Sequence, residues 1–289
     1  AFVMENLLKG AYDLHVHPSP DVVPRRQDDL ELARSYIQEG MKGFVIKAHY
    51  FNTEGRAYHV RQAFPGFNAV GAVVLNNSMG GLNPYAVRQA GMLGTKLVFM
   101  PTMDAQNMWD YLAASGAPIP FGASSKSSGE VQGIRVWENG ALAAPIKEIL
   151  DLILQYDMVL CTGHLAPDES LALLRRAREK GLKKMIATHV EWPATRATLE
   201  QQKEYVRCGA FLEHNIANIM SGDLEIPDLV AQIREIGAEH MVLSTDLGQA
   251  VNPEPAATFA KYVRLLVEAG VTEQEMRLMI AQNPAYLVE

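Results

Sequence analysis

The sequence is poor in cysteine and holds no CxxC pair. Its 289 residues include two cysteines, Cys161 and Cys208, and both lie in apolar surroundings far apart in the chain. Two cysteines cannot build a disulfide framework, and without CxxC spacing they do not form a zinc knuckle. We therefore expect two buried free thiols.

Further absences narrow the class of protein. The net charge is -7 without a basic block, which argues against nucleic acid as a partner. No apolar run approaches the roughly 20 residues of a membrane helix, and residues 1–5 lack the basic and apolar segments of a signal peptide. We expect a cytoplasmic enzyme that takes a small-molecule substrate, with no nucleic-acid or membrane partner. Assembly into a homo-oligomer is left open.

The chain does contain short apolar runs that alternate with helix-like segments. The runs cover residues 11–17, 43–48, 69–75, 95–100, 158–163, 184–189, 209–213 and 241–246. Helices are expected over residues 28–37, 146–156, 168–180, 195–207, 226–236, 254–269 and 272–281. Asp28 and Asp168 are expected to cap the first and the third of them. Near-continuous apolar runs are typical of parallel strands that are covered on both faces.

This alternation predicts an α/β fold, a (β/α)8 TIM barrel that forms a single domain over residues 1–289. A doubly wound open sheet is the alternative. No Gly-x-Gly-x-x-Gly follows an apolar run, which counts against a dinucleotide-binding sheet.

One segment, 101–143 after strand four, is too long for a simple crossover. It holds a serine-rich stretch, 124–129, and then a β-hairpin pattern with an Asn139-Gly140 turn. Long insertions in compact domains are usually functional or mobile, and this one leaves the face where barrel enzymes do their chemistry. It is either a lid or pocket wall, or a surface elaboration or oligomer contact.

Polar residues close several of the apolar runs. His15 and His17 end the first run two residues apart, so both side chains point the same way. His164, His189 and Asp246 end the fifth, sixth and eighth runs. Burying these groups together without a cation would cost several kcal/mol in unpaired polar groups. Three histidines and a carboxylate are the expected ligands of a divalent ion such as Zn²⁺.

This order of residues resembles the amidohydrolase superfamily of metal-dependent barrel enzymes. The likeness covers nearly the whole chain and includes the ending Asn283-Pro284-Ala285. It implies one or two divalent ions, most simply zinc, held by His15, His17, His164 and Asp246. His189 is then either a further ligand or an acid–base group, and Asp246 is the catalytic proton acceptor.

Strand four departs from the superfamily's binuclear pattern, in which a glutamate or a carboxylated lysine bridges two metals. The strand ends Phe99-Met100-Pro101-Thr102, and Lys96 lies near its other end. A mononuclear site, similar to that of the superfamily's deaminases and decarboxylases, lacks such a bridge.

Lys47 on strand two is the main open question. By alternation it shares a face with His49, and a lysine in a buried strand must be paired, deprotonated or modified. Either it is carboxylated and serves as a metal ligand, or it holds an anionic substrate group as a cation, or it forms a structural salt bridge. His49, Glu213 and Arg135 are the other candidates for substrate contact.

The predicted chemistry is hydrolysis of an amide, cyclic amide or lactone bond in a small metabolite. A metal ion lowers the pKa of bound water towards roughly 7, and Asp246 can accept its proton. The alternative is a lyase, a decarboxylase or hydratase, that uses the same residues on a small carboxylate. A non-catalytic metal-binding protein is a third class.

Overall fold

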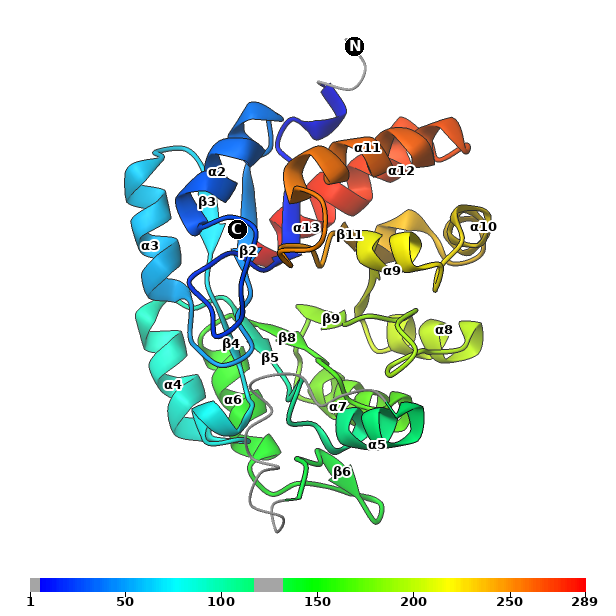
Figure 1. Ribbon diagram of the computed structural model, residues 1–289. Coiled ribbons are helices and arrows are strands. Elements are labelled where there is room, and N and C mark those ends of the chain that lie inside the picture. The colour runs from blue at the N-terminus through cyan, green and yellow to red at the C-terminus, as the bar shows by residue number, and fades with distance from the viewer. Residues whose placement is uncertain (1–5, 117–131) are drawn as a thin grey trace. The chain divides into compact units, whose positions relative to one another are not determined.

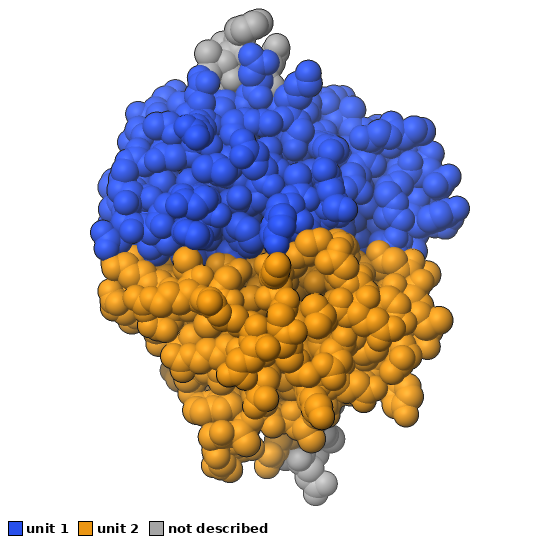
Figure 2. Space-filling view, turned by 180° about the vertical axis from the view of Figure 1, so that it is seen from behind, with its two compact units in different colours: residues 1–47, 53–71, 211–289 blue, residues 48–52, 72–210 orange. Residues whose placement is uncertain are grey.

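The computed structural model describes residues 6–116 and 132–289, which form two compact units (Figures 1 and 2). Unit 1 consists of Ala1–Lys47, Thr53–Gly71 and Phe211–Glu289, and unit 2 of Ala48–Asn52 and Ala72–Ala210. The single domain over residues 1–289 stays a prediction. The serine-rich stretch 124–129 of the insertion lies outside the described residues.

The strands of unit 1 are all parallel where they pair. They are β1 (Tyr12–Val16), β2 (Gly43–Ile46), β3 (Asn68–Val70), β10 (Phe211–Asn215) and β11 (Met241–Ser244). β2 pairs with β1 and β3, and β10 pairs with β11. A parallel bridge from Val16 to Leu247 joins the end of β1 to the loop after β11. The carboxyl ends of β1, β2 and β11 therefore meet at one edge.

Helices cover these strands because each carries an apolar face. They are α2 (Asp29–Gln38), α3 (Glu54–Ala63), α9 (Ile216–Ser221), α10 (Ile226–Ile236), α11 (Pro255–Glu268), α12 (Glu273–Arg277) and α13 (Asn283–Val288). α2 packs against α3 and α11, and α13 packs against β1 and β11 (Figure 1). Asp28 caps α2 as expected, accepting from the backbone N–H of Leu30 and Glu31.

Unit 2 contains its own parallel sheet in the order β4-β5-β8-β9. The strands are β4 (Ala72–Val74), β5 (Leu97–Phe99), β8 (Val159–Cys161) and β9 (Met185–Ala187). Its helices are α4 (Pro84–Leu93), α5 (Gln106–Ser115), α6 (Ile146–Gln155), α7 (Pro167–Glu179) and α8 (Leu199–Arg207). Every strand residue of this sheet is buried, as strands covered on both faces require.

The predicted hairpin is present in unit 2. β6 (Trp137–Glu138) and β7 (Ala141–Leu142) pair antiparallel around Asn139-Gly140. Both turn residues have positive φ, 53° and 78°, which a two-residue hairpin turn of this kind needs. Cys161 and Cys208 are both free and buried, as the sequence indicated.

Two expectations about helices were wrong. Asp168 does not cap α7, because Pro167 already occupies the first turn, where its fixed φ suits a helix start. The expected helix over 272–281 ends at Arg277 and continues as a π-helical turn through Gln282. Pro284 lacks a backbone N–H and so disrupts the regular ladder at this point.

Candidate metal and catalytic residues

His15, His17 and Asp246 come together in unit 1. Oδ1 of Asp246 lies 3.2 Å from Nε2 of His15 and 3.0 Å from Nε2 of His17. Both histidines are buried, and the Asp246 side chain is 24% exposed. One ligand atom from each residue lies within 4.8 Å of the others, a spacing that one metal ion can bridge.

The backbone explains why these three side chains meet. The N–H of Asp246 donates to the carbonyl of His15 at 2.8 Å, and the N–H of His17 donates to the carbonyl of Leu247 at 2.8 Å. Asp246 has a φ of 54°, a left-handed conformation that non-glycine residues adopt mainly at constrained positions. Gly248 has a φ of +123°, and a Cβ there would lie 2.0 Å from the carbonyl oxygen of His17. The close approach of the two loops therefore needs glycine.

Asp13 fastens the strand that carries the histidines. Its carboxylate accepts from the Tyr36 hydroxyl at 2.5 Å, from the Thr245 hydroxyl at 2.5 Å and from the Thr245 N–H at 3.0 Å. It also accepts from the N–H of His15 at 3.2 Å. Burial raises the pKa of Asp13 to about 6, although these hydrogen bonds oppose the rise. Asp13 thus ties β1 to α2 and to the end of β11.

His15 is contacted on both ring nitrogens. Nδ1 lies 3.0 Å from Oε2 of Glu213, which also accepts a hydrogen bond from the Ser244 hydroxyl at 3.0 Å. Nε2 lies 3.0 Å from Nζ of Lys47, a side chain with no exposed surface. Donation from Nδ1 to the carboxylate leaves the Nε2 lone pair directed toward Lys47 and Asp246. Because His214 follows Glu213, alternation along the strand does not decide which of the two side chains faces His15.

The imidazole of His17 is held neutral. Burial lowers its pKa to about 3, against the opposing effect of the Asp246 carboxylate, and the positive charge of Arg25 lowers it further. Arg25 is itself nearly buried, with its guanidinium 2.7 Å from the carboxylate of Asp21. A neutral imidazole is the form that ligates a metal ion.

A second group of rings gathers in unit 2. The ring of His164 lies 5.4 Å from that of His189, 5.9 Å from that of His49 and 4.8 Å from that of Trp192, between centroids. His164 follows β8 and His189 follows β9, and both are buried. The structure thus brings His164 and His189, which the sequence placed at strand ends, together with His49, the candidate for substrate contact.

Local backbone geometry again sets these positions. Gly163, just before His164, has a φ of +63°, and a Cβ there would lie 2.4 Å from the carbonyl oxygen of Met100. His189 has a φ of 52°, and its carbonyl accepts from the Thr195 hydroxyl at 2.6 Å. Strain of this kind tends to occur where a side chain is held for function.

His49 belongs to a hydrogen-bond network that the sequence did not predict. Thr102 Oγ1 lies 2.8 Å from Nδ1 of His49 and accepts from Nδ2 of Asn76 at 2.7 Å. Asn76 also accepts from the N–H of Thr102 at 2.8 Å. In the sequence, His49, Asn76 and Thr102 are marked only as polar residues that follow apolar runs.

Two remaining basic candidates are placed as follows. Arg135 is 45% exposed at its side chain and lies 3.5 Å from Glu138 on the hairpin. Among the described residues no contact joins Arg135 to His164 or His189.

Lys96 donates to the carbonyl of Asp157 at 2.7 Å, next to the amino end of β5. In the described part of the chain, the carboxyl end of β5 therefore carries neither a lysine nor a glutamate.

Comparisons by sequence give one family. The family described as "Family of unknown function (DUF6282)" matches residues 10–213. No curated protein matches the chain. None of the helices in the described ranges is long and apolar enough to cross a membrane.

Comparisons by structure give matches along the whole chain. An amidohydrolase from Pseudomonas aeruginosa has a TM-score of 0.67 at 11% identity, with 99% of this chain and 97% of the other covered. A phosphotriesterase homology protein from Escherichia coli, with phosphate in its active site, has a TM-score of 0.60 at 10% identity, covering 98% and 99%. A putative 2-pyrone-4,6-dicarboxylic acid hydrolase from Pseudomonas putida has a TM-score of 0.60 at 15% identity, covering 96% and 97%. These likenesses confirm the predicted fold class, an α/β barrel.

Proposed function

We propose that this chain, which belongs to the DUF6282 family, is a metal-dependent hydrolase. The observation that carries the proposal is the cluster of His15, His17 and Asp246 in unit 1, whose ligand atoms lie within 4.8 Å of one another. Two imidazoles and a carboxylate are a donor set suited to a divalent ion such as zinc.

The surroundings of the cluster support a metal ion over a simple polar network. His17 is buried and neutral, so its imidazole carries no positive charge that opposes an incoming cation. Nδ1 of His15 is occupied by Glu213, which orients the ring and makes Nε2 more basic. A divalent ion bound there supplies Lewis acidity and lowers the pKa of water towards roughly 7.

Asp246 is the residue that we propose to move the proton. Its carboxylate is partly exposed, whereas the two histidines beside it are buried, so it can reach a water or a substrate. A carboxylate in this position takes the proton of the attacking water and passes it to the leaving group. The backbone hydrogen bond from its own N–H to His15 keeps it in place.

His164 and His189 stay predictions that rest on the resemblance. His164 is the expected further ligand, and His189 is the expected ligand or acid–base group. Their ring contacts in unit 2 support a shared role. His49, whose Nδ1 lies 2.8 Å from Thr102 Oγ1, stays the candidate for substrate contact in unit 2.

For the substrate we propose a small metabolite with a cyclic ester or an amide bond and an acidic group. The likeness to a putative 2-pyrone-4,6-dicarboxylic acid hydrolase supports testing a lactone that carries carboxylates first. A location in the cytoplasm remains part of this proposal.

The test is a substrate screen in ¹⁸O water with zinc-loaded protein. We expect label in the cleaved product, because the attacking oxygen comes from water. Asp246→Asn should lower turnover by about 10²–10⁴-fold, the usual contribution of a positioned proton acceptor. Asp228→Asn, an exposed carboxylate in the first turn of α10, is the matched control and should keep full activity.

Two results would contradict parts of this proposal. Release of carbon dioxide without label in the product would assign the chain to the lyase alternative, with His189 as the leading acid–base group. Equal turnover in Asp246→Asn and in the wild type would remove the catalytic role of Asp246.

A further inference from the structure

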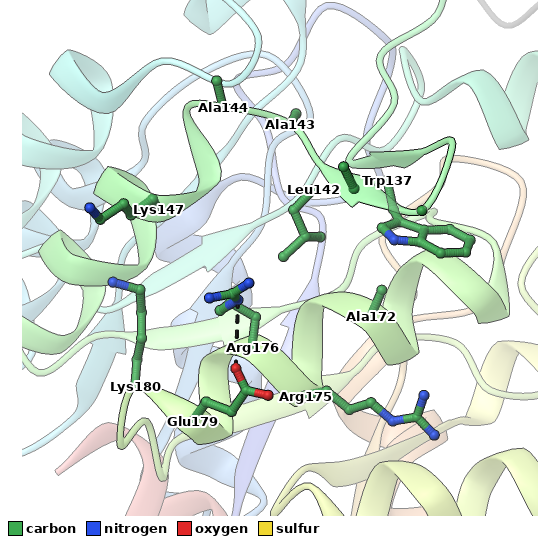
Figure 3. A pocket seen from close by; sticks show the side chains of 12 residues that line it. Trp137, Leu142, Ala143, Ala144, Lys147, Ala172, Arg175, Arg176, Glu179 and Lys180 are labelled. Atoms are coloured by element: carbon green, nitrogen blue, oxygen red, sulfur yellow. Dashed lines mark ion pairs between the residues drawn. The ribbon is translucent and has the colours of Figure 1, made fainter.

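A pocket of about 650 Å³ lies in unit 2, between the hairpin β6–β7, the first turn of α6 and the last turns of α7 (Figure 3). Small-molecule sites usually have volumes of this order. Its lining comprises Trp137, Gly140, Ala141, Leu142, Ala143, Ala144, Lys147, Ala172, Arg175, Arg176, Glu179 and Lys180. None of the histidines considered above lines it.

The hairpin that closes the pocket is held in place. Oε2 of the buried Glu169, on α7, accepts from the N–H of Val136 at 2.8 Å and from the N–H of Trp137 at 3.3 Å. The N–H of Ala143 returns to the carbonyl of Val136 at 2.8 Å. The pocket wall is therefore built before any ligand arrives, which reduces the ordering cost of binding.

The pocket is strongly positive. Four of its lining side chains are cations and one, Glu179, is an anion. In Figure 3 the guanidinium of Arg176 points into the pocket, and the ammonium groups of Lys147 and Lys180 lie toward one side of it. The pair of Arg176 with Glu179 is long, 3.7 Å, and both side chains are more than half exposed, so an anion can compete for the guanidinium.

Lys147 adds a second positive charge to the pocket. Within the described ranges its ammonium group takes part in no hydrogen bond or ion pair. Lys180, in contrast, pairs with Asp151, and Arg175 lies 3.6 Å from Glu204. The charge available to a ligand therefore comes chiefly from Arg176 and Lys147.

The other side of the pocket is apolar and flat. The indole of Trp137 stands opposite the lysines in Figure 3, with Leu142 and Ala172 between them. Trp137 and Leu142 are both partly exposed, although large apolar side chains are usually buried. An aromatic face of this kind binds planar rings by stacking.

We propose that this pocket binds a small molecule that joins a flat ring to an anionic group. The anion lies with Arg176 and Lys147, and the ring lies against Trp137 and Leu142. The pocket is a second ligand site, composed of residues different from those proposed for catalysis.

The probe is naphthalene-1-sulfonate, which has both features and cannot be hydrolysed as an ester or amide. Titration calorimetry of the full chain should give a Kd below a millimolar. Arg176→Gln and Trp137→Leu should each weaken binding about tenfold, because each removes one of the two contacts. Inorganic sulfate and neutral naphthalene-1-methanol, which have one feature each, should bind much more weakly.

Arg178→Gln is the matched control, since Arg178 is an exposed arginine on the same helix that does not line the pocket. It should bind the probe like the wild type. His15→Ala should also bind it unchanged, which separates this site from the proposed metal site. No binding at millimolar probe, or unchanged binding in both Arg176→Gln and Trp137→Leu, would overturn the proposal. Loss of binding in His15→Ala would assign the probe to the catalytic residues.

Discussion

Lys47 places its amine at the one nitrogen of His15 that a metal ion would use. Nζ lies 3.0 Å from Nε2, and the side chain is fully buried. A lysine ammonium donates to this lone pair, so ammonium and metal ion compete for the same electrons. Carboxylation of the amine removes the conflict, because the product is an anion with oxygen ligands. Of the three roles open from the sequence, the carboxylated form agrees best with a metal at His15.

We therefore expect Lys47 to carry a carboxyl group in the zinc-loaded protein. Protein reconstituted with zinc in ¹³C-bicarbonate should show a carbamate carbon resonance that is absent from Lys47→Met. Lys42→Met is the control, because Lys42 is an exposed lysine near the start of β2 that pairs with Glu289, and it should keep the resonance. A wild-type spectrum without the resonance would exclude the carboxylated form and leave the two other roles, a cation that holds an anionic substrate group or a structural salt bridge.

The same residues show what a sequence can and cannot predict about a site. The alternation of side chains along a strand and the polar residues at strand ends were enough to select His15, His17 and Asp246. A polar side chain at the end of a buried strand can take few positions. The contact of Glu213 with His15 could not be predicted, since His214 follows it and either could face inward. The left-handed backbone of His189 and Asp246 also left no mark in the sequence, as it depends on the packing of loops.

At the scale of elements, Glu169 is the contact that fixes the hairpin β6–β7 on α7. Its carboxylate accepts from two hairpin N–H groups and, at 3.4 Å, from the N–H of Ala166. Burial raises the pKa of Glu169, and the three backbone hydrogen bonds oppose that rise. The hairpin is short, and hairpins of this length are not stable on their own.

Glu169→Ala should therefore loosen the hairpin and lower the free energy of unfolding by about 2–4 kcal/mol, the usual effect of leaving buried donors unsatisfied. The measurements are chemical denaturation and hydrogen exchange at Val136 and Trp137. Glu179→Ala, an exposed glutamate on the same helix, is the control and should change stability little. Unchanged exchange at both amides in Glu169→Ala would show that other contacts hold the hairpin.

Most elements could be predicted because periodicity and capping agree with the fold. The helix over 226–236 has the predicted bounds, and Asp28 caps α2 as expected. α4 and α5 were missed for physical reasons. α4 contains Gly91, which lowers helix propensity, and the residue before α5, Ala105, offers no capping side chain.

For the whole molecule, the fold was predictable because eight apolar runs alternate with helical segments from end to end. The fold alone does not assign a reaction, since one barrel scaffold supports many. The structural matches at 10–15% identity support the predicted fold. The proposed reaction has to be supported by the residues of this chain. A measurement on the intact chain that does not depend on knowing the substrate is therefore the most direct test of the metal site.

Metal binding should stabilise the intact protein. An ion present at 100 times its Kd for the native state adds about 2.7 kcal/mol, which for a chain of this size raises Tm by roughly 4–5 °C. Chelator-treated protein should show this rise when zinc is added, and elemental analysis should find about one or two ions per chain. His15→Ala should lose both the rise and the bound ion. His240→Ala, a 43% exposed histidine, should keep both. An equal rise in His15→Ala and wild type would mean that zinc binds elsewhere, and the proposed metal site would be wrong.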